Sequence, residues 1–269
     1  MLTSAEISRK WEGIAQTKSS LPFLKCLLLA VLAGLYISLG AIGATLIQAS
    51  AGAEVGKLLG ACVFPAGLIL ILTAGGELFT GNCLMAGALV NRKVSGAGML
   101  RNLCIVYVGN ILGAFLGAVL ASCGGVLLAG GEKAVALAVT IAQNKVSLSF
   151  LDALLRGVGC NVLVCGAVYA ATGAESGGGK AVLAFFPVML FVLCGLEHCV
   201  ANMYYVPAVL LMKGMPRYAV SADGVTVGAY LLRNLLPVTL GNVLGGFGFG
   251  ICYAVIHREK PASSSTLSA

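Results

Sequence analysis

Two segments of the sequence place a glutamate, an asparagine five residues later and small polar side chains inside otherwise apolar runs. The first reads Glu77-Leu-Phe-Thr-Gly-Asn82 and the second reads Glu197-His-Cys-Val-Ala-Asn202. Ionisable side chains surrounded by apolar sequence are costly in a membrane and usually face a protein interior or a wet cavity. The two segments therefore predict a polar pathway inside an apolar protein.

The second segment holds His198, whose imidazole can exchange a proton near neutral pH. We expect it to donate a proton to a permeating weak acid or to sense pH at a gate, and a hydrogen-bonded structural histidine is the alternative. Thr80 and Asn202, with their small neighbours, would supply backbone N–H groups and short polar side chains to a bound anion. His257 ends the last apolar run, beside Arg258, and is expected at the membrane interface.

Glu77 and Glu197 have no charged neighbour in sequence. Bare carboxylates in an anion pathway would repel the guest, so we expect them to be structural charges that cap a half-helix or pair with a basic residue. Arg101 and Arg233 are candidate partners. The alternative is that the two glutamate side chains line the pore.

Two lysines, Lys18 before the first apolar run and Lys145 before the fourth, can raise the anion concentration at a pore mouth. Snorkelling to the membrane surface is the commoner explanation for a single lysine there.

Asparagines also occur within the apolar runs. Asn110 and Asn242 can bridge a broken loop to a neighbouring helix or serve as plain interhelical contacts. Asn161 could orient His198. Cys194, His198 and Cys199 make no convincing metal-ligand set, and no phosphate loop, nucleophile elbow or dinucleotide fingerprint is present, so we expect no metal, no cofactor and no enzyme activity.

The composition decides what kind of protein positions these residues. Of 269 residues, 59% are apolar and 10% are charged, against roughly 25% charged in soluble domains. The chain is therefore expected to be an integral membrane protein, and a soluble enzyme, a nucleic-acid reader and a disordered chain are excluded. The net charge of +7 is scattered between apolar runs, so it predicts no nucleic-acid partner.

The uncharged runs predict the number of membrane passes. They are 26–53, 58–76, 78–91, 102–131, 157–174, 181–196, 198–212 and 234–257. A spanning helix needs about 20 residues, so 58–91 and 181–212 each read as one span interrupted by a glutamate. This gives six transmembrane helices, the second and fifth broken, in an all-α integral membrane protein.

The two halves of the sequence repeat. Residues 101–113 read RNLCIVYVGNILG, and RNLLPVTLGNVLG follows at an offset of 132 residues. Three passes per half make the repeat inverted, with broken helices in matching positions. The predicted organisation is an interfacial amphipathic helix in 1–22, a channel domain in 23–258 with repeats at about 23–131 and 150–257, and a tail in 259–269.

The basic residues predict the orientation. With both termini inside, 10 Lys and Arg lie on the cytoplasmic side and 7 lie outside, so both termini are expected to be cytoplasmic. The expected location is a bacterial-type inner membrane.

Together the motifs resemble those of the formate/nitrite transporter family. Glu77-Leu-Phe-Thr80 is similar to the family signature in the broken second span, and Glu197-His-Cys-Val-Ala-Asn-Met203 to that in the fifth. Asn161-Val-Leu-Val-Cys165 resembles its fourth-span motif and Leu240-Gly-Asn242 its sixth-span motif. The similarity runs from about residue 18 to 256. Among the branches of the family, the sequence as a whole most resembles the hydrosulfide channels.

The resemblance implies an aquaporin-like protomer in a homopentamer, with one pore per protomer for formate, nitrite or hydrosulfide. It implies that His198, Thr80 and Asn242 share a network and that Lys145 and Lys18 stand in the outer and inner vestibules. It also implies apolar constrictions at Phe64, Leu68, Leu78, Phe79, Val164 and Phe191.

These observations predict a channel for small monovalent weak-acid anions, with hydrosulfide favoured, that cross an apolar slit as anion plus proton. A water or small-polyol pore is an alternative, although Cys83 and Met203 stand where an Asn-Pro-Ala motif would have proline. A proton-coupled secondary transporter and a thiol or redox enzyme are the others. The expected partners are small inorganic or organic anions, the lipid bilayer and further copies of the chain.

Overall fold

The computed structural model describes residues 1–258, apart from the side chains of residues 53 and 54, and the predicted tail in 259–269 lies outside the described residues. Over the described residues every regular element is helical, which confirms the predicted all-α class. The first half contains α1 (Ser4–Ser19), α2 (Phe23–Ala51), α3 (Ala53–Val63), α4 (Ala66–Ala74), α5 (Phe79–Asn82), α6 (Met85–Val90) and α7 (Gly96–Ser122).

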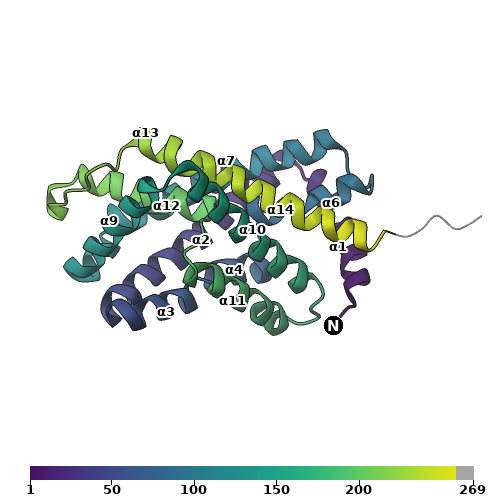
Figure 1. The fold of residues 1–269 in the computed structure, drawn as a ribbon, viewed down its shortest axis with the longest axis horizontal. Coiled ribbons are helices and arrows are strands. Elements are labelled where there is room, and N and C mark those ends of the chain that lie inside the picture. Colours follow the sequence, from purple (N-terminus) through teal and green to yellow (C-terminus); the bar gives the residue numbers. More distant parts are fainter. Residues whose placement is uncertain (259–269) are drawn as a thin grey trace, which may run out of the picture.

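The second half contains α8 (Val126–Ala129), α9 (Gly131–Ser147), α10 (Phe150–Thr172), α11 (Gly177–Leu193), α12 (Cys199–Lys213), η1 (Pro216–Tyr218), α13 (Val227–Ala229), the π-helical η2 (Tyr230–Leu235) and α14 (Leu236–Ile256). The long helices lie side by side, and α1 lies beside the C-terminal end of α14 (Figure 1). The hydroxyl of Ser4 is 2.8 Å from Nε2 of His257, so the described N- and C-terminal segments meet on one side of the molecule.

Five helical stretches are long and apolar enough to cross a membrane. They are Phe23–Ala51, Val55–Ala74, Gly96–Ser122, Phe150–Thr172 and Val227–Ile256. Shorter apolar helices occupy Phe79–Val90, Gly177–Leu193 and Cys199–Lys213. A sixth pass requires α11 and α12 to cross together as one interrupted span.

A glycine stands at or near the start of each of the two interruptions. Gly75 follows α4 with φ 99°, and Gly195 follows α11 with φ 67°. Side chains other than glycine rarely adopt such backbone angles, so the helices end there. The two glycines are 120 residues apart, as are the two glutamates that follow them.

The most extensive helix contacts are those of α2 with α7 and of α10 with α14. Glycines make these contacts close: a Cβ atom at Gly113 would collide with the carbonyl oxygen of Val31, and one at Gly245 with that of Val158. Gly113 and Gly245 are repeat-equivalent. Backbone-to-backbone packing through small residues therefore holds each half together.

The helices α1 and α9 occupy equivalent places ahead of the two halves, although the sequence analysis predicted no helix in 131–147. Each carries a lysine in its last turn, Lys18 in α1 and Lys145 in α9. A capping box of Thr3 and Glu6 starts α1, and its buried face includes Ile7 and Trp11. The structural repeat thus extends ahead of the predicted boundaries at residues 23 and 150.

Candidate functional site

One asparagine from the last helix of each half holds each break open. At the first break, Asn110 donates from Nδ2 to the carbonyl oxygen of Glu77 at 2.9 Å and accepts the backbone N–H of Phe79 at 2.9 Å. At the second, Asn242 donates to the carbonyl oxygen of Glu197 at 2.9 Å and accepts the N–H of Cys199 at 2.8 Å. These bonds satisfy backbone groups that the missing helical turns would leave unpaired.

The side chain of the first glutamate, Glu77, forms a buried ion pair with Lys18. Lys18 Nζ lies 2.6 Å from Oε1 of Glu77, and Asn82 donates to the other carboxylate oxygen at 2.6 Å. Asn102 accepts from Asn82 at 2.9 Å and donates to the carbonyl oxygen of Lys18 at 2.9 Å. The carboxylate is therefore neutralised and fixed on both oxygens.

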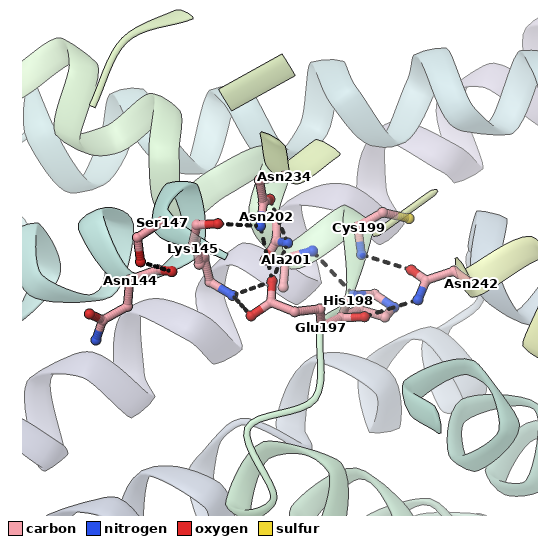
Figure 2. A network of polar contacts seen from close by, with 10 residues as sticks. All are labelled: Asn144, Lys145, Ser147, Glu197, His198, Cys199, Ala201, Asn202, Asn234 and Asn242. Atoms are coloured by element: carbon pink, nitrogen blue, oxygen red, sulfur yellow. Dashed lines mark hydrogen bonds and ion pairs between the residues drawn. The ribbon is translucent and has the colours of Figure 1, made fainter. Parts of the chain in front are cut away.

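The second glutamate has the same surroundings (Figure 2). Lys145 Nζ lies 3.0 Å from both oxygens of Glu197, and Asn202 donates to Oε2 at 2.6 Å. Asn234 accepts from Asn202 at 2.8 Å and donates to the carbonyl oxygen of Lys145 at 3.1 Å. Each pair of lysine and glutamate thus joins a broken helix to the helix that precedes its half.

The predicted basic partners of the glutamates were wrong. Arg101 donates to the carbonyl oxygen of Leu21 at 3.0 Å instead, and Arg233 is exposed. In the repeated Arg-Asn dipeptide it is the asparagine, one helical step further, that faces inward. The repeat of that dipeptide was therefore the signal for Asn102 and Asn234, which sequence reasoning did not single out.

The two breaks meet through His198 and Thr80. Nε2 of the histidine lies 2.9 Å from the threonine hydroxyl, and Nδ1 accepts the backbone N–H of Ala201 at 3.1 Å. Because Nδ1 accepts, the neutral ring carries its proton on Nε2 and donates it to Thr80. Both side chains are buried.

Asn161 braces the first break rather than the histidine. Its amide donates to the carbonyl oxygens of Thr80 at 3.2 Å and Asn242 at 2.6 Å. Both amide hydrogens are therefore used, and no contact with His198 is present among the described residues, contrary to the expected role.

Two vestibules lie on either side of the breaks. One has a volume of about 350 Å³ and is lined by three cationic side chains, Lys10, Lys18 and Lys180, with Glu77 as the one acidic side chain among its described lining residues. The other has about 490 Å³ and is lined by Lys57, Lys145 and Arg156, with Glu197 as its counterpart. In both, positive side chains outnumber negative ones, which favours anions.

A small apolar chamber lies between the vestibules. Its volume is about 10 Å³, and it is lined by Ile37, Phe64, Leu68, Leu78, Val164, Val188, Phe191 and His198. Leu68 and Leu78 also line the first vestibule, whereas Phe64, Phe191 and His198 also line the second. The chamber therefore bridges the two, with space for about one water molecule.

Phe79 does not line the chamber or either vestibule, so its expected place in a constriction is not what the structure shows. Its ring packs edge-on against Tyr107 with centroids 4.8 Å apart. Leu78 has an extended backbone, and successive side chains of an extended segment point to opposite sides. Leu78 faces the chamber, and Phe79 consequently faces the helices.

A model of the formate/nitrite transporter family matches residues 5–256 of the chain. The chain belongs to the formate/nitrite transporter family. The resemblance of the broken-span motifs to this family is thereby confirmed.

Relatives of this chain include a probable formate transporter of Methanothermobacter thermautotrophicus, 38% identical over 92% of this chain and 94% of that protein. The formate channel FocA of Haemophilus influenzae is 34% identical over 96% of this chain and 94% of its own length. Such relatives are channels and transporters, not enzymes.

Solved structures share the fold of this transporter. An FNT family ion channel superposes with a TM-score of 0.83 at 26% identity, covering 95% of this chain and 99% of that one. A pentameric formate channel with formate bound gives 0.75 at 32% identity, covering 88% and 98%. The channel architecture therefore extends over almost the whole chain.

Proposed function

We propose that this transporter is a channel for small monovalent anions of weak acids, which cross as anion plus proton. The observation that carries the proposal is the pair of cationic vestibules separated by a chamber of about 10 Å³ with mostly apolar walls. The vestibules attract the anion, and the chamber rejects it while it stays charged.

Desolvation is the physical reason for the proton. An isolated ion placed in apolar surroundings without compensation is disfavoured by many kcal/mol, so such groups neutralise instead. A weak-acid anion that takes a proton in the vestibule enters the chamber as a neutral molecule. Sulfate stays divalent and phosphate stays charged near neutral pH, and both are too large for the chamber, so both are excluded.

The site residues have different roles in this permeation. Lys18 and Lys145 raise the local anion concentration, and their glutamate partners keep them at the breaks. His198 stands on the chamber wall and holds the hydroxyl of Thr80. Thr80 lines neither the chamber nor a vestibule, and by accepting from His198 it fixes the ring that does. The histidine is thus the polar contact where the second vestibule narrows to the chamber. There the ring takes a second proton from vestibule water, passes it to the anion and returns to its neutral form.

Formate is the substrate supported by the relatives, because several are named formate channels or transporters. Nitrite has a similar size and charge. Hydrosulfide remains our chemical prediction, since its conjugate acid is weaker than formic acid and more of it is neutral near neutral pH.

For the assembly we propose a homopentamer in a bacterial-type inner membrane, with six passes per protomer and both termini cytoplasmic. A pentameric structural neighbour and the excess of basic residues on the side of the termini support this arrangement. The vestibule lined by α1 then opens to the cytoplasm.

The test is initial flux into proteoliposomes of formate, nitrite, hydrosulfide, chloride, sulfate and glycerol, each measured from about pH 5.5 to 7.5, where imidazole titrates. Formate and hydrosulfide should pass and sulfate should not. Formate flux should rise as the pH falls, because the protonated fraction of its acid increases. Appreciable sulfate flux, or glycerol entering faster than every anion, would contradict the anion channel and favour the aquaporin-like pore. Accumulation of formate beyond the level that the imposed pH gradient sets for one proton per anion would indicate a coupled transporter.

A further inference from the structure

A third cavity lies outside the pathway. Its volume is about 400 Å³, and it shares no lining residue with the vestibules or the chamber. It is formed by the first half of α1, the turn between α6 and α7 and the residues that follow α14. Figure 1 shows these elements together at the end of the molecule where the N-terminus lies.

The cavity is strongly basic. Arg9, Arg92, Lys93 and Arg258 all line it. The one acidic lining residue among the described ones is Glu12, which accepts a hydrogen bond from Asn91 at 2.7 Å. Within residues 1–258 no acidic side chain forms an ion pair with Arg92, Lys93 or Arg258. Cations gathered in this way repel one another unless an anion lies among them.

The backbone keeps an arginine at this place against its own preference. The helix α6 ends in a Schellman motif, in which Lys93 N–H bonds to the carbonyl oxygen of Ala88 and Arg92 N–H to that of Leu89. The residue at the left-handed position of such a motif is usually glycine or asparagine. Here it is Arg92, with φ 57°, although an asparagine stands next to it. A strained residue in a cavity wall suggests a function for its side chain.

Exposed apolar side chains lie close in sequence to the cationic residues of the cavity. Val90 ends α6, Val255 and Ile256 end α14, and all three are exposed. Each is within three residues of a cationic lining residue. Basic pockets between spanning helices at a membrane surface suit anionic lipid headgroups, and exposed apolar side chains beside them suit acyl chains. A soluble phosphate compound would use only the basic part.

We propose that this cavity binds the phosphate headgroup of an anionic phospholipid in the leaflet on the side of the termini. The phosphate lies among Arg92, Lys93 and Arg258, and the acyl chains lie along Val90 and the end of α14. The lipid would tie the interfacial helix α1 to α6 and α14. The site does not depend on which anion the channel conducts.

The experiment measures binding of phosphatidylglycerol and phosphatidylcholine with identical acyl chains to the delipidated protein, by native mass spectrometry and by the shift in Tm. Inorganic phosphate and glycerol phosphate serve as soluble probes. The test variant is Arg92→Gln with Arg258→Gln. The matched control is Lys25→Gln with Lys133→Gln, two exposed cations outside this cavity whose loss changes the net charge equally.

Phosphatidylglycerol should bind the wild type more tightly than phosphatidylcholine, and the test variant should bind it about tenfold or more weakly. The control pair should bind as the wild type does, and Arg92→Lys with Arg258→Lys should retain most of the affinity. Equal binding of both lipids, or an unchanged affinity in the test variant, would overturn the proposal. Displacement of the lipid by inorganic phosphate or glycerol phosphate at similar concentration would assign the cavity to a soluble phosphate ligand instead. If the test variant does not assemble, Lys93→Gln alone replaces it and should weaken phosphatidylglycerol binding about fivefold; unchanged binding there counts equally against the lipid.

Discussion

At the first break, Glu77 is surrounded by Lys18 and three asparagines, Asn82, Asn102 and Asn110. At the second break, Glu197 is surrounded by Lys145 and three asparagines, Asn202, Asn234 and Asn242. Corresponding hydrogen bonds agree within a few tenths of an ångström. The two breaks therefore share one arrangement of side chains around the glutamate, called the frame below, which pairs the exposed backbone groups inside a membrane protein.

The two breaks differ at all four positions between the glutamate and the asparagine, and two of these differences bear on the chemistry. Leu78 corresponds to His198, and Thr80 corresponds to Val200. One break thus contributes the histidine and the other contributes the threonine, and the two side chains meet at 2.9 Å. The comparison teaches that the repeated residues maintain the architecture, whereas the chemistry lies where the repeat is broken.

The largest expected effect comes from removing a vestibule lysine from the shared frame. Lys18→Met and Lys145→Met each leave a buried carboxylate without its cation, and breaking such a pair destabilises a fold by about 3–5 kcal/mol. Both variants should lose most of the assembled protein, measured by size-exclusion yield and Tm. The two halves should respond alike.

The control for this prediction removes both charges. Lys145→Met combined with Glu197→Gln should recover the assembly that the single variant loses, because no unpaired charge remains. Anion flux in the recovered protein should stay low if Lys145 also gathers the anion. A single variant with normal yield and Tm would contradict the structural role of the pair.

The next effect concerns the asparagines that hold the breaks. Asn110→Leu and Asn242→Leu each leave a backbone N–H and two carbonyl groups without their side-chain partner. Unpaired buried groups of this kind destabilise by about 1–3 kcal/mol each, and we expect a loss of roughly 2–4 kcal/mol with partial relaxation. Thermal unfolding checks the prediction, and Asn144→Leu, at an asparagine beside the second vestibule with no such role, is the matched control.

Much of this frame was readable in the sequence because the chain repeats it. The two glutamate motifs, 120 residues apart, located both breaks, and the repeat at an offset of 132 residues marked the asparagine that contacts each break. Charge-free runs predicted the helical class, since few other structures satisfy the backbone in lipid.

What the sequence did not reveal depends on direction and on distant contacts. Arg101 and Asn102 are neighbours, and only the rotation of the helix decides that the asparagine points toward Glu77. The pairing of Lys18 with Glu77 joins residues 59 positions apart, and helical periodicity does not tell which residue of another element a side chain reaches. Phe79 was assigned to the pathway by resemblance, and the extended backbone at Leu78 turns its ring away.

A more local effect is expected at His198 and Thr80, the contact that the repeat does not duplicate. His198→Asn should lower formate flux about tenfold or more, or shift its pH profile, with normal assembly, because an amide accepts and donates hydrogen bonds but does not exchange protons in this pH range. The equivalent change on the other break, Leu78→Met, keeps an apolar chamber wall and should change flux less than about twofold. Wild-type flux and pH profile in the histidine variant would exclude a proton-donor role.

The smallest expected effect is a change in size selectivity, and it distinguishes the chamber wall from its surroundings. Phe64 and Phe191 pack edge to face with centroids 5.6 Å apart, and both line the chamber and the second vestibule. Replacing both by alanine removes two rings from the narrow wall, so lactate should enter at a measurable rate while formate flux changes little. Phe79→Ala removes a ring of the same size that packs on Tyr107 instead, and it should leave lactate excluded. Lactate and formate uptake into liposomes, compared at equal protein content, measures both. If both variants exclude lactate, these aromatic rings serve packing alone. If Phe79→Ala admits lactate as readily as the double variant, the two faces of the first break are not distinct.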